Sequence, residues 1–299
     1  NSMTEHLHSE AAKYLEASRD DQIHWLNTRK WFPYDTGNRM LEKIEAMIKH
    51  PPTHRMPSMM LVGETNNGKT MILEEALSRH PRRSIPEEEA DQIPVIFITM
   101  PPGPELRRFY KQVLDKVGAV HRPSDTTANL ESQVLHVLKG VGTRLIIIDE
   151  LHNISEGKFT QQRQFLNMLR FLSNELRLSF ICAGTKKAIR TIQTDDQLAN
   201  RFKPYNLPEW KDGKDYRRFL YFLESTLPLP EPSNLHKSEL ARTILTVSER
   251  TVGEMVSYVK EATFIALDES SAHLKPHHFE IADYTSPSRR KAEAEQIAG

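Results

Sequence analysis

The sequence predicts an α/β protein in which helices flank a parallel β-sheet, followed by a small helical domain. Short apolar runs alternate with helical patterns between residues 58 and 207, which is the order of parallel strands joined by crossover helices. The run at 145–148 is apolar at every position, as expected for a central strand that is buried on both faces. After Pro208 only helical patterns follow.

The N-terminal segment, residues 4–52, is predicted to be helical. Apolar residues recur at helical spacing up to Leu15, and a second helix begins at Ile23. Asp35 or Thr36 can cap a third helix, because their side-chain oxygens accept hydrogen bonds from the amides of a first turn. A pair of prolines then ends this helix, since the residue before a proline disfavours helical backbone.

The central segment, residues 53–208, contains the strand patterns. Each predicted strand is a short apolar run bounded by turn residues, and a helical pattern separates it from the next. The expected strands are 58–62, 94–99, 145–148, 178–183 and 205–207, and the expected helices are 71–77, 106–117, 130–138 and 165–176.

Residues 209–272 are expected to form a small helical lid. Its predicted helices are 216–227, 235–246 and 251–267. The helical pattern fails from His273 onward, where Pro276 and Pro287 interrupt the chain. Residues 273–299 are therefore expected to be a mobile polar tail.

Composition limits the possible partners and the compartment. The 299 residues include 40 basic and 40 acidic side chains, so the formal net charge is zero. Nucleic-acid binding would therefore require a local basic patch or repeated subunits rather than an overall positive field. The single cysteine, Cys182, lies in a predicted strand as a core residue, excludes a disulfide framework and fits a reducing, cytoplasmic compartment. No apolar run approaches the ~20 residues of a transmembrane helix, so no membrane association is expected.

Residues 63–70, Gly-Glu-Thr-Asn-Asn-Gly-Lys-Thr, match the phosphate-binding pattern G-x-x-x-x-G-K-[ST]. A predicted strand before the motif and a predicted helix after it supply the context that the pattern requires. The glycines let backbone amides approach phosphate oxygens at the positive end of the helix. Lys69 is expected to reach the outer phosphates of a nucleoside triphosphate, and the Thr70 hydroxyl is expected to bind Mg²⁺.

Two acids, Asp149 and Glu150, end the apolar strand at 145–148. In a chain with a phosphate-binding lysine, the first carboxylate is expected near the magnesium ion. The second, Glu150, is placed to orient or deprotonate the attacking water. The alternative for Asp149 is a strand-end acid that only caps the next turn. The presence of Lys69 in the same chain makes this alternative weaker.

Three further polar residues allow two interpretations each. Thr185 follows the fourth strand and either contacts the γ-phosphate or attacking water, or caps the next helix. From the residues alone, Arg201 is better explained as a surface arginine paired with Asp195 or Asp196 than as a group that reaches a neighbouring subunit. His152 is better explained as a loop histidine than as a polar sensor.

The order of these motifs resembles that of AAA+ P-loop ATPases. More closely, the sequence is similar to the TniB/TnsC family of transposon-encoded AAA+ regulators, over about residues 25–262. The resemblance rests on residues 55–58 (Arg-Met-Pro-Ser), 63–71, 145–151 and 198–202 (Leu-Ala-Asn-Arg-Phe).

The resemblance implies a set of site residues. Those that contact ATP are Gly63, Glu64, Thr65, Asn66, Asn67, Gly68, Lys69, Thr70 and Met71. Thr70 and Asp149 would bind Mg²⁺, while Glu150 and Thr185 would act in hydrolysis. Arg201 corresponds to the arginine finger, which favours a catalytic role over the surface pair. Residues 250–254 lie where AAA+ proteins carry a second sensor, but their arginine precedes the glycine instead of following it.

The resemblance also implies partners. Such proteins assemble as homo-oligomeric rings or helical filaments on duplex DNA, and act with a transposase and a TniQ-type target-selection protein. DNA contacts are expected from residues 101–104 leading into Arg107, Arg108 and Lys111, which could track phosphates without reading bases. A solvated helix face explains these three residues equally well.

The resulting expectation is a DNA-dependent AAA+ ATPase that regulates transposition through slow, regulated ATP hydrolysis. One alternative is a helicase loader or DNA motor subunit. Another is an adaptor that binds nucleotide without catalysis, which the presence of both Asp149 and Glu150 disfavours.

Overall fold

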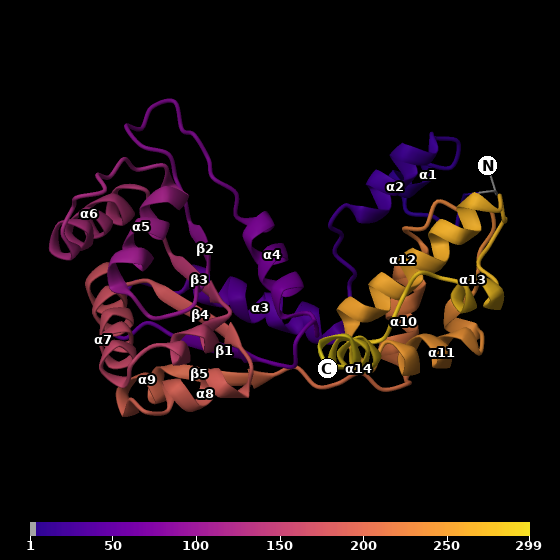
Figure 1. The fold of residues 1–299 in the computed structure, drawn as a ribbon. Coiled ribbons are helices and arrows are strands. Elements are labelled where there is room, and N and C mark those ends of the chain that lie inside the picture. Colours follow the sequence, from indigo (N-terminus) through magenta and orange to yellow (C-terminus); the bar gives the residue numbers. More distant parts are fainter. Residues whose placement is uncertain (1–3) are drawn as a thin grey trace. The chain divides into compact units, whose positions relative to one another are not determined.

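The computed structural model describes residues 4–299. The described chain forms two compact units (Figure 1). The α/β unit comprises Arg39–Thr65 and Lys69–Pro208, and the helical unit comprises Asn66–Gly68, Glu209–Gly299 and the described residues up to Asn38. The expected N-terminal segment is thus divided between the two units.

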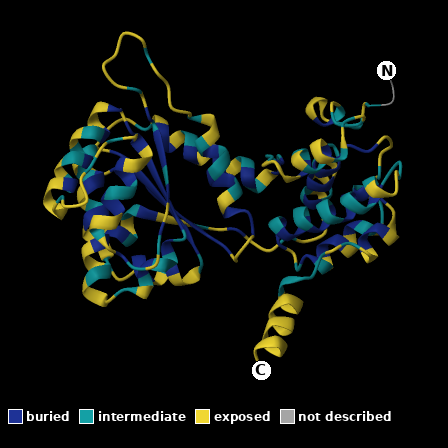
Figure 2. Cartoon of the chain, turned by 45° about the horizontal axis from the view of Figure 1, so that its top comes forward, coloured by how far each residue is buried: buried dark blue, intermediate teal, exposed yellow. Residues whose placement is uncertain are grey.

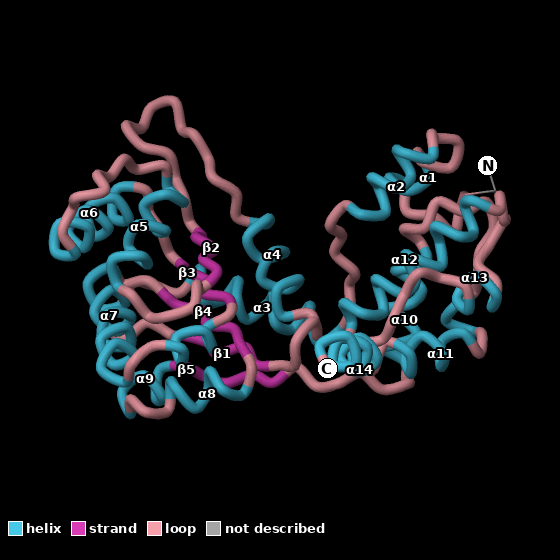
Figure 3. Tube along the Cα trace, in the orientation of Figure 1, coloured by secondary structure: helices cyan, strands magenta, loops and turns pink. Residues whose placement is uncertain are grey.

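The α/β unit is built on a five-stranded sheet in the order β2-β3-β4-β1-β5, in which every neighbouring pair is parallel. Its strands, magenta in Figure 3, are β1 (Ser58–Val62), β2 (Val95–Thr99), β3 (Leu145–Asp149), β4 (Ser179–Gly184) and β5 (Phe202–Asn206). The predicted parallel sheet is confirmed, and the first four predicted strands match the observed ones to within one residue at either end.

Burial separates the central strands from the edge. Strands β1, β3 and β4 are buried at every residue, because helices cover both faces of a parallel sheet. β5 is an edge strand in which only Phe202 is buried, and it contains Pro204, which cannot donate to a strand ladder and is tolerated at an edge. The fifth strand begins earlier than predicted because buried Phe202 pairs with Ser58.

Helices cover both faces of the sheet (Figure 1): α5, α6 and α7 lie on one face, and α3 and α4 lie on the other. The helices are α3 (Asp35–Lys49), α4 (Lys69–Arg79), α5 (Leu106–Val117), α6 (Thr127–Gly140), the 3-10 helix η1 (Leu151–Glu156), α7 (Phe159–Leu176), α8 (Lys186–Ile192) and α9 (Asp196–Arg201). The bounds of α5 are those predicted.

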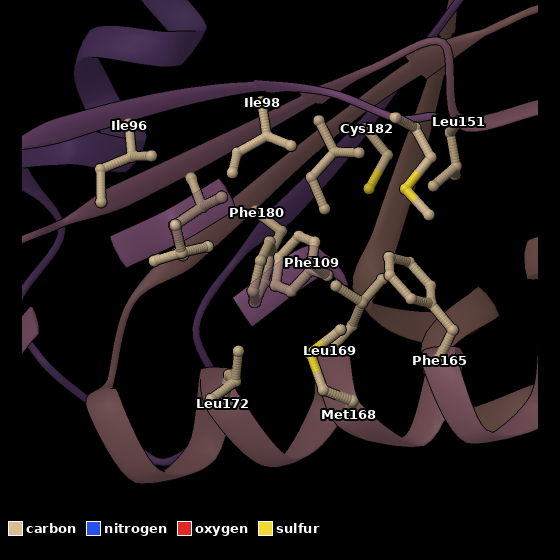
Figure 4. Packing of buried hydrophobic residues seen from close by; sticks show 14 of the residues in the cluster. Ile96, Ile98, Phe109, Leu151, Phe165, Met168, Leu169, Leu172, Phe180 and Cys182 are labelled. Carbon is tan, nitrogen blue, oxygen red and sulfur yellow. The ribbon is translucent and has the colours of Figure 1, made fainter. Parts of the chain in front are cut away.

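The main apolar core lies between the sheet and helices α5 and α7 (Figure 4). Phe109 of α5 meets Phe165 of α7 edge to face, with the ring centroids 5.4 Å apart. Cys182 of β4 is fully buried in this core, and burial raises the pKa of its thiol. The prediction that Cys182 is a core residue is confirmed.

The helical unit has an aromatic core. The ring centroid of Phe219 lies 5.6 Å from the ring centroid of Phe32 and 5.2 Å from that of Trp210. The helices are α1 (Ser9–Ala12), α2 (Arg19–Asn27), α10 (Lys214–Glu224), η2 (Leu235–Lys237), α11 (Leu240–Val247), α12 (Val252–Asp268), α13 (Pro276–Glu280) and α14 (Pro287–Ala298). Among residues 4–299, no helix combines the length and apolarity needed to cross a bilayer.

The C-terminal region corrects one expectation. The prediction that the helical pattern fails after His273 is wrong, because Pro276 and Pro287 begin α13 and α14 rather than interrupt them. Proline suits the first turn of a helix, where its missing N–H has no intrahelical partner to lose. α14 buries none of its residues, and Figure 2 shows it exposed along its length.

Candidate functional site

The turn from β1 to α4 carries the phosphate-binding motif at the carboxyl end of the sheet. The ammonium group of Lys69 donates to the carbonyl oxygens of Gly63 (2.7 Å) and Glu64 (2.6 Å). Lys69 is buried, and burial lowers its pKa, although the nearby carboxylates of Asp149, Glu150 and Glu64 act in the opposite direction. A cation held inside a loop at a helix N-terminus favours an anionic ligand.

The residues of the motif differ in exposure. Gly63, Asn67, Gly68 and Lys69 are buried, Met71 is half-buried, and Glu64, Thr65, Asn66 and Thr70 are exposed. Gly68 has a φ of 91°, in the left-handed region that favours glycine. The exposed polar groups and the buried glycines are the arrangement expected of a loop whose backbone faces a ligand.

The middle of the motif, Asn66–Gly68, packs within the helical unit. The backbone amide of Gly253 donates to the carbonyl oxygen of Asn66 at 2.9 Å, and the side-chain amide of Asn66 donates to Oε1 of Glu254 at 2.9 Å. A Cβ on Gly253 would lie 2.0 Å from Oδ1 of Asn66, so a larger residue cannot replace Gly253 without moving the loop. Because Asn66 and Glu254 are far apart in the sequence, no local pattern could indicate this contact.

Thr70 and Asp149 meet directly. The Thr70 hydroxyl donates to Oδ2 of Asp149 at 2.7 Å, and the backbone amide of Glu150 donates to Oδ1 of the same carboxylate at 2.9 Å. Asp149 is buried at the end of β3. A hydroxyl beside a carboxylate offers the hard oxygen ligands that Mg²⁺ prefers, so this pair fits the predicted metal.

Glu150 adopts an unusual backbone conformation. Its φ of 58° and ψ of 36° are left-handed, which costs about 1–2 kcal/mol for a residue with a Cβ. Oε2 of Glu150 lies 2.9 Å from Nε2 of His152. The turn is fixed by Asn153, whose backbone amide donates to the Glu150 carbonyl at 3.0 Å and whose side chain donates to the Met100 carbonyl at 2.7 Å. No motif in the sequence indicates Asn153, and His152 is the residue that was expected to be a plain loop histidine.

Thr185 follows β4 at the same edge of the sheet. It occupies the N-cap position of α8, but its hydroxyl makes no capping hydrogen bond. The capping interpretation is therefore right about the position of Thr185, but no capping hydrogen bond from its side chain supports it in the described chain. In the strand order, β4 lies between β1 and β3, so Thr185 follows the strand that separates Gly63 from Asp149.

Arg201 ends α9 and is held by α7. Its guanidinium donates to Oδ1 of Asn174 at 2.7 Å. Partial burial and the nearby guanidinium groups of Arg55 and Arg170 lower the pKa of Arg201, against a smaller effect from Asp195. The ion pair to Asp195 is made by Arg170, at 3.8 Å. Arg201 is therefore held by a neutral amide in a cluster with excess positive charge.

The basic residues expected to contact DNA lie on α5. Arg107 and Arg108 are exposed, and Lys111 is half-buried. Arg107 donates a hydrogen bond to the Pro123 carbonyl oxygen. The opposite face of α5 is buried in the core, so the basic residues occupy the solvent side of this helix.

A separate group of metal-ligand types, Glu269, His277 and His278, lies in the helical unit. Both histidines contact Oε2 of Glu269 through Nε2, at 2.7 Å and 2.9 Å. The backbone amide of Lys275 donates to Nδ1 of His278 at 2.9 Å, so Nε2 of this histidine carries the hydrogen. His278 then has no lone pair directed at a metal. The three residues therefore form a hydrogen-bonded cluster that does not suit a metal ion.

Several solved structures have a fold similar to that of this chain. The chain is similar to the Aeropyrum pernix ORC2 protein solved as ADPNP and ADP complexes, with 12% identity and a TM-score of 0.63, over 86% of this chain and 70% of that one. It is also similar to the A. pernix ORC1 protein in complex with DNA, with 14% identity and a TM-score of 0.59, over 91% and 69%. A third similar structure is the Thermotoga maritima RuvB Holliday junction branch migration motor, with 12% identity and a TM-score of 0.50, over 86% and 71%. These likenesses establish the fold, which is that of AAA+ P-loop proteins.

The sequence matches no curated protein. It does match the family model described as bacterial TniB protein, over residues 22–212. This span includes the β1–α4 turn, the Thr70–Asp149 pair and Arg201, and it accounts for more than half of the chain. The chain therefore belongs to the bacterial TniB family.

Proposed function

We propose that this TniB-family chain is an ATPase that assembles on duplex DNA and regulates transposition. The observation that carries the proposal is the hydrogen bond between Thr70 and Asp149, beside buried Lys69. This arrangement supplies a cation and an oxygen ligand set at the carboxyl edge of a parallel sheet, which suits a triphosphate and its metal.

Each residue of the site has a proposed role. Residues 63–71 bind the nucleotide, and Thr70 and Asp149 would hold Mg²⁺, which when bound neutralises charge on the phosphate oxygens. Glu150 accepts a proton from the attacking water. The water oxygen bonds to the γ-phosphorus as the bond to the ADP oxygen breaks. Thr185 orients this water or the γ-phosphate.

Arg201 acts between copies of the chain. Its guanidinium lies at the end of α9, held by Asn174 and close to Arg55 and Arg170. Such a group stabilises the charge that develops on a neighbouring copy's γ-phosphate. Hydrolysis therefore depends on assembly, which supports a ring or filament whose lifetime on DNA is set by ATP turnover.

DNA binding is assigned to the solvent side of α5. Arg107, Arg108 and Lys111 contact phosphates, and repetition along an oligomer multiplies a small patch into a strong one. This accounts for DNA binding by a chain of zero formal net charge. The family resemblance supports a transposase and a TniQ-type protein as the further partners.

The experiment that tests the proposal compares wild type with Lys69→Ala and Glu150→Gln. ATP binding, phosphate release and assembly on duplex DNA are measured for each. Lys69→Ala is expected to abolish nucleotide binding and ATP-dependent assembly together. Glu150→Gln is expected to bind ATP, to hydrolyse it at least about 100-fold more slowly, and to give longer-lived oligomers.

Two results would contradict the proposal. ATP-dependent DNA assembly that is unchanged in Lys69→Ala would separate the site from assembly. Phosphate release that is unchanged in Glu150→Gln would remove Glu150 from catalysis. Strand separation or directed movement on DNA by the wild type would instead identify a motor, while nucleotide binding without phosphate release would identify an adaptor.

A further inference from the structure

Glu254 of α12 accepts hydrogen bonds from three side chains. Its Oε1 accepts one from the side-chain amide of Asn66 at 2.9 Å and another from the guanidinium of Arg290. Its Oε2 accepts one from the Tyr284 hydroxyl at 2.6 Å. One carboxylate therefore joins the phosphate-binding loop to residues 284–290, the segment that leads into α14.

This carboxylate is covered and charged. The side chain of Glu254 is only 7% exposed, and a buried charge is stable only when donors compensate it. Burial raises the pKa of Glu254, but the hydrogen bonds from Tyr284, Arg290 and Asn66 hold it below its ordinary value. Hydrogen bonds to an ionised group are roughly twice as strong as those between neutral groups. Loss of Tyr284 or Arg290 as a donor therefore weakens the hold on the group that Asn66 contacts.

Asn66 needs such a hold because its backbone is left-handed, with a φ of 63°. This conformation costs free energy for a residue with a Cβ and persists only where the surroundings maintain it. In a turn it lets neighbouring amides point to one side and form a concavity that suits an anion. The Gly253 amide holds the carbonyl oxygen of Asn66 at 2.9 Å, and Glu254 holds its side chain. The shape of the loop therefore depends on the first turn of α12.

The segment 284–290 is anchored on the same helical unit. The ring of Tyr284 stacks on that of Tyr258 of α12, with the ring centroids 4.7 Å apart. The backbone amide of Ser288 donates to Oε1 of Glu249 at 3.0 Å. α14 buries none of its residues, and the Arg290 side chain is 52% exposed. Arg290 can therefore be changed without opening the apolar core.

We infer that Tyr284 and Arg290 are positioning residues, which set the nucleotide affinity of the phosphate-binding loop by holding Glu254 against Asn66. The inference rests on the proposed function, since it assigns a support to the loop that is proposed to bind ATP. Both residues act through Glu254. Without these two donors the loop spends less time in its binding shape, and the apparent affinity falls in proportion.

The test measures the affinity of the full chain for a fluorescent ATP analogue. In the double variant Tyr284→Phe with Arg290→Gln, phenylalanine keeps the ring on Tyr258, and glutamine removes the charge. The expected affinity is about 10-fold lower, as it would be if the binding shape fell to about a tenth of the population. KM for ATP with duplex DNA should rise by the same factor, while kcat at saturating ATP stays the same. Arg290→Lys alone keeps a charged donor and should keep most of the affinity.

Arg289→Gln is the matched control. Arg289 is the neighbour of Arg290 on α14 and pairs with Glu293 at 3.4 Å, so its loss should leave the affinity at the wild-type value. Hydrogen exchange of the nucleotide-free chain gives a local readout. The amides of residues 64–68 should exchange faster in the double variant, while those of α11 are unchanged.

Several results would overturn the inference. They are tighter binding by the double variant, an equal loss of affinity in Arg289→Gln, and exchange that rises in α11 as much as at 64–68. In the Glu254→Ala background the double variant should cause no further loss, and losses that multiply would also overturn it. Should Glu254→Ala fail to fold, Glu254→Leu replaces it with the same expected results.

The affinity measurement also separates this inference from the proposed function. A wild type that does not bind the ATP analogue would overturn both. Equal binding of the analogue by the wild type and by the double variant would overturn the role of Tyr284 and Arg290 alone.

Discussion

The Thr70 hydroxyl donates a hydrogen bond of 2.7 Å to Oδ2 of Asp149, and so joins the first turn of α4 to the end of β3. The two residues come from separate motifs in the sequence. Their contact makes one oxygen-rich site from a loop that approaches phosphate and a strand that ends in a carboxylate. Removal of either oxygen should therefore change the same measured quantity, which is the Mg²⁺ dependence of ATP hydrolysis.

Thr70→Ala should lower ATP hydrolysis about 10-fold or more and raise the Mg²⁺ concentration required for half-maximal rate. The reason is that alanine removes the hydroxyl that would bind the metal. Thr70→Ser keeps the hydroxyl and serves as the matched control. The test is a Mg²⁺ titration of ATP hydrolysis by wild type, Thr70→Ala and Thr70→Ser. Equal curves for the alanine and serine variants would contradict the assignment.

Asn174→Ala should lower ATP hydrolysis in the DNA-bound oligomer, because Asn174 accepts the hydrogen bond that holds Arg201. Asn174→Asp should lower ATP hydrolysis further, since a carboxylate would neutralise the guanidinium that is proposed to contact a phosphate. Nucleotide affinity of the unassembled chain should not change.

Mixed oligomers give a second readout. Oligomers mixed from Arg201→Ala chains and Lys69→Ala chains should recover part of the ATP hydrolysis that each variant lacks alone. No recovery would argue against action between copies.

Arg108→Gln with Lys111→Gln should weaken binding to duplexes of any sequence, because these residues are assigned to phosphates. The slope of log affinity against log salt concentration should fall by roughly 2 per subunit. Lys187→Gln with Arg190→Gln is the matched control, since these exposed residues have the same spacing on α8. Similar losses in both double variants would indicate a general charge effect instead of a site on α5.

Glu254 should make the stability of the helical unit depend on pH. Burial alone raises the pKa of Glu254, but hydrogen bonds from Tyr284, Arg290 and Asn66 outweigh burial and hold the pKa below its ordinary value of 4.5. A folded-state pKa below the unfolded one gives stability that is present above pH 4.5 and lost as the pH falls through the folded value. The difference in unfolding free energy between wild type and Glu254→Gln should therefore be largest at neutral pH and shrink in acid.

Glu261 provides the control of opposite sign. Burial raises the pKa of Glu261 above 4.5, so its ionised form is disfavoured in the folded protein at neutral pH. Glu261→Gln should stabilise the chain at neutral pH and have less effect in acid. The free energy of unfolding in urea is measured for Glu254→Gln and Glu261→Gln at neutral and at acid pH. A change of the same sign in both variants would contradict the assignments.

The sequence predicted those parts of the fold that depend on local pattern. The apolar run at 145–148 and the amphipathic pattern at 106–117 correspond to β3 and α5, because burial on a sheet or on one helix face leaves a regular spacing of apolar residues. Pro276 and Pro287 misled the prediction, since a proline interrupts or begins a helix according to a position that sequence spacing does not reveal.

Sequence motifs predicted the part of the site whose geometry they fix. They could not predict contacts that depend on an unusual backbone conformation or on segments far apart in the sequence. Lys69, Thr70 and Asp149 are brought together as their motifs require. The 2.9 Å approach of His152 to Glu150 depends on a left-handed residue that is not a glycine, and no residue type signals that conformation. The contact of Asn66 with Glu254 joins segments far apart in the chain, so only the folded structure reveals it.

The burial of Cys182 has a practical consequence. Thiol-directed labels react with the thiolate, and the only cysteine of the chain is fully buried with its pKa raised. Wild-type protein should therefore take up little maleimide dye while folded. A cysteine introduced at the 88% exposed Ile297 would then carry a single fluorophore on α14, and would allow the proposed assembly on DNA to be tested one molecule at a time.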